Sequence, residues 1–214
     1  MSKLKEIFTN IYNKDVWQGR ESKSGKGSDI ENTKDFIPEL VKLIKKLEVK
    51  TLLDCASGDF NWMKEVMKEL PEISYLGYDI VTPLIEKNNE LYASNKILFQ
   101  IADITENILP KHDLVFCRDC LVHLSFKSIN KFFKNFVDGG SKYLLVTSFT
   151  GDRENKDYDE YERMWRTLSF HKEPFEYLPF PLEVINENCK EGNMKFSDKS
   201  LLLYSRESLI ECGI

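Results

Sequence analysis

The pattern of hydrophobic and polar positions alternates between short apolar runs and helical stripes along most of the chain. Apolar runs predict strands at 51–54, 73–78, 97–101, 113–117 and 141–148, with weaker candidates at 182–185 and 200–204. Apolar residues at helical spacing predict helices at 4–12, 36–47, 60–70, 82–92 and 129–139. Strands that alternate with helices build parallel sheets covered on both faces, so the pattern predicts an α/β fold.

The stretch 51–63 has the pattern of a strand, a tight turn and a helix. Its apolar run ends at Asp54, and the small residues Ala56, Ser57 and Gly58 follow. A turn of small residues before a helix lets a ligand approach backbone N–H groups at the helix's positive end. Gly58 alone does not establish a site, because many α/β proteins place a glycine there without binding anything. Asp54 strengthens the case, since a carboxylate that closes an apolar strand needs a partner.

Two more carboxylates follow predicted strands, Asp79 after 73–78 and Asp103 after 97–101. Carboxyl ends of parallel strands meet at one edge of a sheet, so we expect these acids to converge with Asp54. An acid in the position of Asp79 can accept hydrogen bonds from ribose hydroxyls, as in NAD enzymes. Taken singly, either acid could instead cap a helix or lie in a loop.

The turn resembles motif I of the class I S-adenosylmethionine-dependent methyltransferases, acidic-x-Gly-x-Gly-x-Gly. Asp54 and Gly58 match, whereas Ala56 and Phe60 replace the first and last glycines, and Phe60 implies a bulkier pocket edge. The resemblance implies a Rossmann-like fold with a mainly parallel seven-stranded sheet and S-adenosylmethionine as cofactor, with Asp103 near the adenine amine. The expected cofactor-binding residues are Trp17, Ser24, Gly25, Ser28, Asp54, Ala56, Ser57, Gly58, Trp62, Asp79, Ile80, Asp103, Ile104, Cys117 and Arg118.

The predicted strand 113–117 leads into a segment that contains Arg118, Asp119 and His123. Similar Arg-Asp-x-Leu-x-His-Leu sequences line the acceptor cavity in class I methyltransferases that act on small molecules. The resemblance implies catalytic roles for these three residues, with His123 as a general base, because a neutral imidazole can take a proton near pH 7. The alternative is a histidine that only hydrogen-bonds to backbone at the sheet edge.

The segment 149–181 is rich in aromatic residues, with eight among residues 149–180, and it includes Tyr158, Tyr161, Arg163 and His171. We interpret it as a lid that also forms the acceptor pocket, although it could simply pack on the sheet edge. The expected substrate-binding residues are Phe149, Asn155, Trp165 and Arg166. Residues 1–35 are expected to cover the cofactor. Together these segments resemble small bacterial methyltransferases encoded with capsule or glycan genes.

Length and composition favour one soluble domain over residues 1–214. The net charge of −5 opposes a basic nucleic-acid-binding face, and no apolar run reaches membrane-spanning length. The N-terminus lacks the apolar core of a signal peptide, so we expect a cytoplasmic protein. The five cysteines fit a reducing compartment, and the pair Cys117 and Cys120 has no second pair at zinc-finger spacing, so no metal is expected.

The predicted activity is methyl transfer to an oxygen of a small polar acceptor, a sugar or a phosphorylated or nucleotide-linked precursor of a surface polysaccharide. N-methylation of a small molecule or protein and a non-catalytic subunit that binds S-adenosylmethionine are the alternatives. An NAD-dependent oxidoreductase is disfavoured, because a dinucleotide pyrophosphate favours Gly-x-Gly-x-x-Gly and this turn has one glycine. The oligomeric state is left open.

Overall fold

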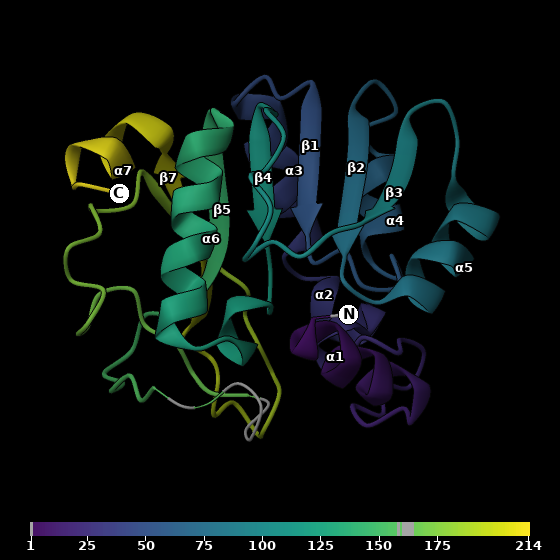
Figure 1. The fold of residues 1–214 in the computed structure, drawn as a ribbon, viewed down its shortest axis with the longest axis horizontal. Helices are drawn as coiled ribbons and strands as arrows, with labels where there is room; N and C mark the ends of the chain where they lie inside the picture. The colour runs from purple at the N-terminus through teal and green to yellow at the C-terminus, as the bar shows by residue number, and fades with distance from the viewer. Residues whose placement is uncertain (1, 158, 160–164) are drawn as a thin grey trace. The chain divides into compact units, whose positions relative to one another are not determined.

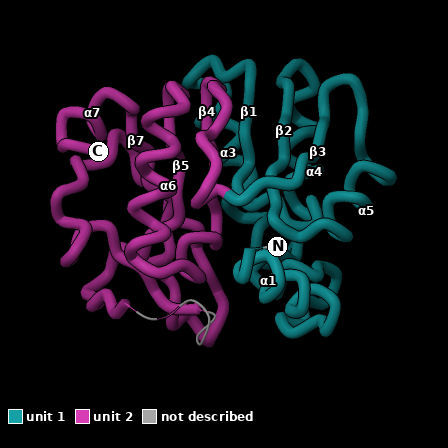
Figure 2. Tube along the Cα trace, in the orientation of Figure 1, with its two compact units in different colours: residues 1–103 teal, residues 104–214 magenta. Residues whose placement is uncertain are grey.

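The computed structural model describes residues 2–157, 159 and 165–214. The chain divides into two compact units, residues 1–103 and residues 104–214 (Figure 2). The residues Tyr158, Tyr161 and Arg163 of the expected lid lie outside the described residues.

The first unit consists of helices that alternate with three strands (Figure 1). In chain order, the elements are α1 (Lys3–Asn13), the 3-10 turn η1 (Lys26–Ser28), α2 (Ile30–Thr33), α3 (Ile37–Lys46), β1 (Thr51–Cys55), α4 (Met63–Lys68), β2 (Ser74–Asp79), α5 (Thr82–Tyr92) and β3 (Ile97–Ile101). The strands are all parallel, in the order β3-β2-β1, with Leu53 opposite Leu76 and Leu76 opposite Leu98. Helix α5 packs against β2 and β3, and α3 packs against α4.

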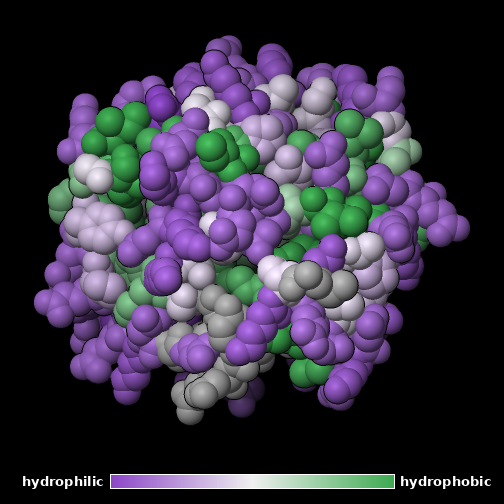
Figure 3. Space-filling model, in the orientation of Figure 1, coloured by the Kyte–Doolittle hydropathy of each residue, from purple (hydrophilic) through white to green (hydrophobic). Residues whose placement is uncertain are grey.

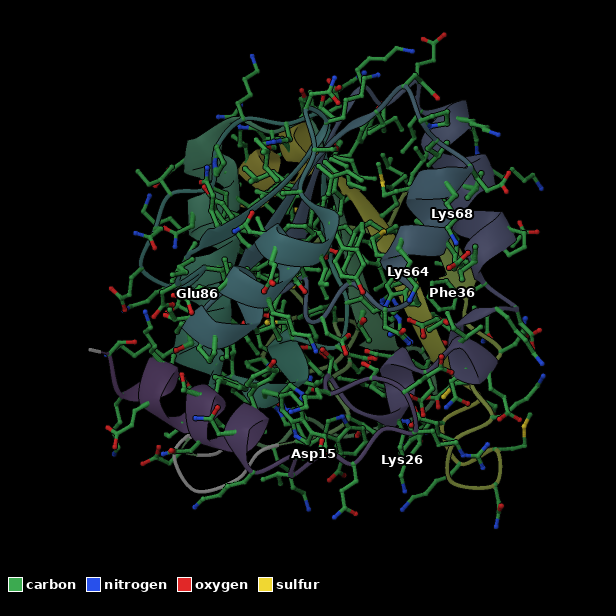
Figure 4. The ribbon with its side chains drawn as sticks, turned by 90° about the vertical axis from the view of Figure 1, so that its right-hand side faces the viewer. Asp15, Lys26, Phe36, Lys64, Lys68 and Glu86 are labelled. Carbon is green, nitrogen blue, oxygen red and sulfur yellow. The ribbon has the colours of Figure 1, made fainter. Side chains whose placement is uncertain are left out.

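Helix α4 shows why the apolar stripe of this unit faces inward. Met63, Val66 and Met67 are buried, whereas Lys64 is half-buried and Lys68 is exposed (Figure 4). Burying such a stripe removes apolar surface from water and leaves the ammonium groups hydrated. The helix expected from residue 60 begins only at Met63, because the residues before it form the turn.

The described residues of the second unit form four strands, the long helix α6 and the short helix α7 (Figure 1). Its elements are β4 (Leu114–Cys117), the 3-10 turn η2 (Leu121–His123), α6 (Phe126–Gly139), β5 (Tyr143–Phe149), β6 (Glu183–Asn186), β7 (Lys199–Ser205) and α7 (Arg206–Glu211). The strand order is β4-β5-β7-β6, with β4 and β5 parallel and β7 antiparallel to both of its neighbours.

The ends of α6 follow the local sequence. The Ser125 side chain accepts a hydrogen bond from the backbone N–H of Ser128 at the helix start. The helix stops at Gly139, and Gly140 takes a left-handed conformation with φ of 74°. Phe132, Phe133 and Phe136 project into the interior of this unit. The expected α/β fold with a mainly parallel seven-stranded sheet is confirmed, with each strand within about two residues of its predicted position.

The surface carries no large apolar face on the side seen in Figure 3, where hydrophilic residues dominate and hydrophobic ones form separate patches. Within the described part of the chain, no helix is both long and apolar enough to cross a membrane. All five cysteines lie in described segments and are free thiols. The described residues contain no group of histidine, cysteine and carboxylate side chains arranged to hold a metal ion.

Candidate functional site

The first unit brings the three predicted acids to one end of its sheet. Because β1, β2 and β3 run parallel, Asp54 in β1, Asp79 at the end of β2 and Asp103 just after β3 all lie at the strands' carboxyl ends. Asp54 and Asp79 are buried, and Asp103 is half-buried. This is the arrangement that the sequence predicts, within a single unit.

Asp79 links the end of β2 to the turn after β1. Its Oδ2 accepts a hydrogen bond from the backbone N–H of Gly58 at 3.2 Å, and its Oδ1 accepts one from Val81 at 3.0 Å. Burial raises the pKa of Asp79 to about 6, although the backbone N–H donors oppose this shift. Asp79 is therefore ionised at neutral pH, and an ionised carboxylate has acceptor sites beyond these two.

The turn between β1 and α4 is held from several sides. The backbone N–H of Ser57 donates to the carbonyl of Tyr78 at 2.8 Å, and the carbonyl of Gly58 accepts from the Asn88 side chain at 2.7 Å. Gly58 has φ of 54°, and a Cβ there would lie 2.4 Å from the Ser24 hydroxyl. Only glycine suits both the backbone conformation and the close approach of Ser24.

The N-terminal segment is fastened to this turn by Asp59. The Asp59 carboxylate accepts hydrogen bonds from the Ser22 hydroxyl at 2.9 Å and from the backbone N–H of Lys23 at 2.8 Å. A second carboxylate, Asp29, is buried and accepts backbone N–H groups of residues 20–22. The loop after α1 is thus a defined structure rather than a freely moving chain.

The fit of an adenosyl cofactor to this turn can be tested on Ser57. Its hydroxyl oxygen is buried, and no described residue forms a hydrogen bond with it. A buried hydroxyl without a partner is costly, and a polar ligand at the turn would supply that partner. Together with the Asp79 carboxylate, this oxygen fits the hydroxyl and amino groups of an adenosyl group.

The remaining predicted cofactor residues of the first unit have varied surroundings. Trp17 is half-buried, with its ring 6.2 Å from that of Phe8, and its Cβ would lie 3.1 Å from a Cβ built on Gly25. Trp62 is buried edge-on against Phe36 at 5.2 Å. The carbonyl of Ser28 accepts a hydrogen bond from Asn61 at 3.1 Å. Their contact with a cofactor stays a prediction.

Asp54 and Phe60 line the interior beside this turn. The hydroxyl of Tyr75 donates to Asp54 Oδ2 at 2.7 Å, so one carboxylate oxygen faces the protein. The Phe60 ring lies in an aromatic cluster, 5.0 Å from Tyr75 and 5.1 Å from Phe99 between ring centres. Phe60 has φ of 59° and is buried, so its side chain points into the core.

The second unit places Arg118 and Asp119 directly after β4. The Arg118 guanidinium contacts both oxygens of Glu187, with Nη2 to Oε2 at 2.8 Å, and its Nη1 lies 3.2 Å from Asp119 Oδ2. Burial opposes the charge, but Glu187 and Asp119 together raise the pKa of Arg118 above its usual value. Ile104 and Cys117, also predicted at the cofactor, are buried in this unit.

His123 lies in the turn η2 and is half-buried. Burial lowers its pKa to about 4, while Asp119 opposes the shift and Arg166 adds to it. The imidazole also hydrogen-bonds to the backbone of Asp119. His123 is therefore neutral at pH 7, which is the form that a base requires, but it is a weaker base than an ordinary histidine.

Of the four predicted substrate-binding residues, three are held by contacts within the second unit or are buried, and one is exposed. Asn155 holds its own segment together, since it donates to the carbonyl of Ser169 at 2.7 Å and accepts from the backbone N–H of Ser169 at 2.8 Å. Arg166 lies over the Phe126 ring at 5.1 Å. Phe149 is buried, whereas Trp165 is 43% exposed. Trp165 is therefore the member of this set with a ring surface open to a ligand.

Several residues that shape these sites were not found from the sequence. Asn88 is a polar residue on the apolar stripe of α5, and this mismatch is a signal that could have marked it. Asp29 and Asp59 lie in loops, where carboxylates are common, so no local signal separates them from others. Glu187 and Lys199 contact Arg118 and Asp119 across long sequence separations, which no local pattern records.

Comparisons with known proteins address the fold. No protein-family model matches the chain. Over 92 residues the chain is 33% identical to phosphoethanolamine N-methyltransferase of Plasmodium falciparum, a match that covers 40% of this chain and 34% of that relative. The chain thus spans only about a third of the curated relative it matches.

Solved methyltransferase structures resemble almost the whole chain. The 1,6-didemethyltoxoflavin-N1-methyltransferase of Burkholderia thailandensis, solved with S-adenosylhomocysteine, has a TM-score of 0.65 at 13% identity and covers 94% of this chain and 86% of its own. Magnesium protoporphyrin IX methyltransferase of Synechocystis PCC 6803, also with S-adenosylhomocysteine, has a TM-score of 0.62 at 11% identity and covers 95% and 98%. Human N-acetylserotonin methyltransferase, solved with S-adenosylmethionine, has a TM-score of 0.56 at 14% identity and covers 80% of this chain and 51% of its own. The chain therefore has the fold of the class I methyltransferases.

Proposed function

We propose that this protein is an S-adenosylmethionine-dependent methyltransferase that acts on a small polar acceptor. The observation that carries the proposal is the turn after β1, where the buried Asp79 carboxylate lies beside the buried Ser57 hydroxyl, which has no hydrogen-bond partner among the described residues. These groups suit the ribose and amino groups of the cofactor. Several solved structures of the same fold contain S-adenosylmethionine or S-adenosylhomocysteine, which supports this choice.

Asp79 would accept hydrogen bonds from the ribose hydroxyls, and Asp103 would accept one from the adenine amine. Asp54, Ala56 and Gly58 would surround the remainder of the cofactor, covered by the segment 17–28. When bound, S-adenosylmethionine supplies an activated methyl group on a positively charged sulfur. The protein's main contribution is then to hold the acceptor in line with that methyl group and to exclude water.

His123 would receive the proton that the acceptor hydroxyl releases as its oxygen gains the methyl group. The neutral imidazole can accept this proton, but its lowered pKa limits the driving force for the transfer. Positioning should therefore contribute more to the rate than proton removal. Arg118 and Asp119 would support His123, and Trp165 would stack on the acceptor, with Phe149, Asn155 and Arg166 shaping the pocket around it.

The acceptor we favour is a sugar, or a phosphorylated or nucleotide-linked precursor of a surface polysaccharide, methylated on oxygen. The partly exposed Trp165 supports it, since aromatic faces pack well against sugar rings. A nitrogen acceptor is the second candidate, favoured by the similarity to a phosphoethanolamine N-methyltransferase. Five free thiols and a net charge of −5 support a reducing cytoplasmic location and no nucleic-acid partner.

The cofactor is tested first, by thermal unfolding with S-adenosylmethionine, S-adenosylhomocysteine or NAD. We expect both adenosyl compounds to raise Tm and NAD to leave it unchanged, because only a ligand that binds the folded state stabilises it. Stabilisation by NAD alone would instead indicate an oxidoreductase.

The reaction is tested with S-adenosylmethionine that carries a labelled methyl group. Nucleotide sugars and amino-alcohol phosphates are offered separately, and the product is analysed for the methylated atom. Label on a sugar oxygen supports the favoured acceptor, and label on nitrogen supports the second candidate. Cofactor binding without label transfer to any acceptor of a cell extract, small molecule or protein, would indicate a non-catalytic subunit.

A further inference from the structure

Four charged side chains form a compact cluster in the interior of the second unit. Arg118 and Asp119 follow β4, Glu187 follows β6, and Lys199 begins β7. Lys199 forms an ion pair with Asp119 and lies 3.3 Å from Glu187 Oε2, while Arg118 bridges the same two carboxylates. The exposed fractions of the Arg118, Lys199 and Glu187 side chains are 4%, 4% and 1%, against 26% for Asp119.

Stability alone is a weak explanation for this cluster. Two cations and two anions cancel in charge, but removing each from water costs several kcal/mol, and well-packed apolar residues often stabilise a core as well. Removing one member, by contrast, leaves an uncompensated buried charge. The cluster therefore enforces one arrangement of its members, and the member that reaches solvent is Asp119.

The backbone at Asp119 is held in an unusual conformation. Its φ is 55°, a left-handed value that costs free energy for a residue with a side chain. Its backbone N–H donates to the hydroxyl of Thr147 at 2.9 Å, and its carboxylate forms ion pairs with Lys199 and Arg118. Burial opposes ionisation of Asp119, but these two cations outweigh it and hold its pKa below the usual range.

Asp119 also orients the imidazole of His123. The imidazole hydrogen-bonds to the Asp119 backbone, and among the described residues Asp119 and Arg166 are the charged groups that shift its pKa, in opposite directions. A ring N–H that donates to a carbonyl leaves the lone pair on the other ring nitrogen. The position and net charge of the cluster therefore determine both the orientation of the ring and the field around it.

We propose that Glu187 and Lys199 are positioning residues, which hold Asp119 and, through it, His123 in the arrangement that methyl transfer requires. This proposal rests on the proposed function for its effect on turnover, but not for its effect on His123 itself. Neither residue needs to touch the acceptor or the cofactor.

The test follows the titration of His123 by NMR in four forms of the full chain: wild type, Lys199→Met, Glu187→Gln and the double variant. Loss of Lys199 leaves the cluster with one excess negative charge, so the midpoint of His123 should rise toward that of an ordinary histidine. Loss of Glu187 leaves the cluster with one excess positive charge and should lower the titration midpoint of His123. The double variant restores neutrality and should return the midpoint to the wild-type value. His112 and His171 serve as internal references.

Turnover is measured on the same proteins. We expect kcat to fall about tenfold in each single variant, with recovery in the double variant, while the KM for S-adenosylmethionine is unchanged. A residue that only stabilises the fold would lower the free energy of unfolding in each single variant but would leave the kcat of the folded protein unchanged. An identical His123 midpoint in all four proteins would overturn the proposal.

Two variants keep the test decisive if a single substitution prevents folding. Lys199→Arg and the double variant both preserve the neutral cluster, so both should retain the His123 midpoint. Movement of the midpoint in either would contradict the proposal. Shifted midpoints in a protein that transfers no methyl group to any acceptor would contradict the proposed function alone.

Discussion

Asp79 combines burial with backbone hydrogen bonds from Gly58, Ile80 and Val81, and burial and hydrogen bonding have opposite effects on its proton affinity. Burial is the larger effect and raises its pKa to about 6, whereas the N–H groups of Val81 and Gly58 favour the carboxylate. This single side chain therefore links a structural role, bracing the turn after β1, with the proposed role as ribose acceptor. Its charge state changes within a pH range that is accessible to binding experiments.

We expect Asp79→Ala to weaken S-adenosylmethionine binding by about one to two powers of ten, or about 1.5–3 kcal/mol. Wild-type affinity should also fall as pH decreases through about 6, because protonation removes the acceptor. Calorimetry between pH 5 and 8 measures both effects, and Asp79→Asn, which has no titrating carboxylate, is the matched control. Equal affinity in wild type and Asp79→Ala would disprove the ribose contact.

At the scale of elements, the turn between β1 and α4 joins the sheet to the N-terminal segment. Gly58 donates to Asp79, accepts from Asn88 and leaves space for the Ser24 hydroxyl. The Asp59 carboxylate then holds residues 22 and 23 beside the same turn. The segment expected to cover the cofactor is thus attached where the cofactor is proposed to bind.

Gly58→Ala should lower stability more than Gly140→Ala. Both glycines have positive φ, 54° and 74°, so both variants incur a backbone penalty of about 1 kcal/mol. Only at Gly58 would the new methyl group meet Ser24, because nothing lies within 4 Å of a Cβ at Gly140. Urea unfolding measures stability, and calorimetry should show weaker cofactor binding for Gly58→Ala alone. Equal losses in the two variants would show that the close approach of Ser24 has no energetic effect.

At the scale of the whole molecule, two groups with shifted pKa values affect stability in opposite directions as pH changes. His123 has its pKa lowered to about 4, so between about pH 4 and 6.5 the unfolded chain binds more protons and stability rises with pH. Asp79 has its pKa raised to about 6, so between about pH 3.8 and 6 the folded chain binds more protons and stability falls with pH.

Replacing His123 separates the two contributions. Relative to His123→Gln, wild-type stability should decrease by about 1–3 kcal/mol as pH falls from 6.5 to 4 and should be constant above pH 7. Denaturant unfolding of both proteins at several pH values measures this difference. A difference that does not change with pH would show that His123 titrates normally in the folded protein.

The strand positions could be predicted from the sequence more accurately than the start of α4. Periodicity placed every strand within about two residues, and the end positions of Asp54 and Asp79 followed from the parallel arrangement. The start of α4 was predicted three residues too early, because Phe60 has apolar spacing but a left-handed backbone that a hydropathy pattern does not reveal. The fold inferred from motif I agrees with the solved structures, whereas the cofactor, the activity and the assigned site residues remain proposals.

The sequence by itself determined the order of strands and helices and the edge at which the acids of the first unit lie. Both depend on local periodicity and on a general rule for parallel strands, and so they can be read from neighbouring residues. Only the tertiary structure decided which partners the buried charges have: Lys199 meets Asp119 across 80 positions, and Arg118 meets Glu187 across 69. A hydropathy pattern records whether a side chain is buried, but the partner of a buried charge depends on which distant strand the fold places beside it.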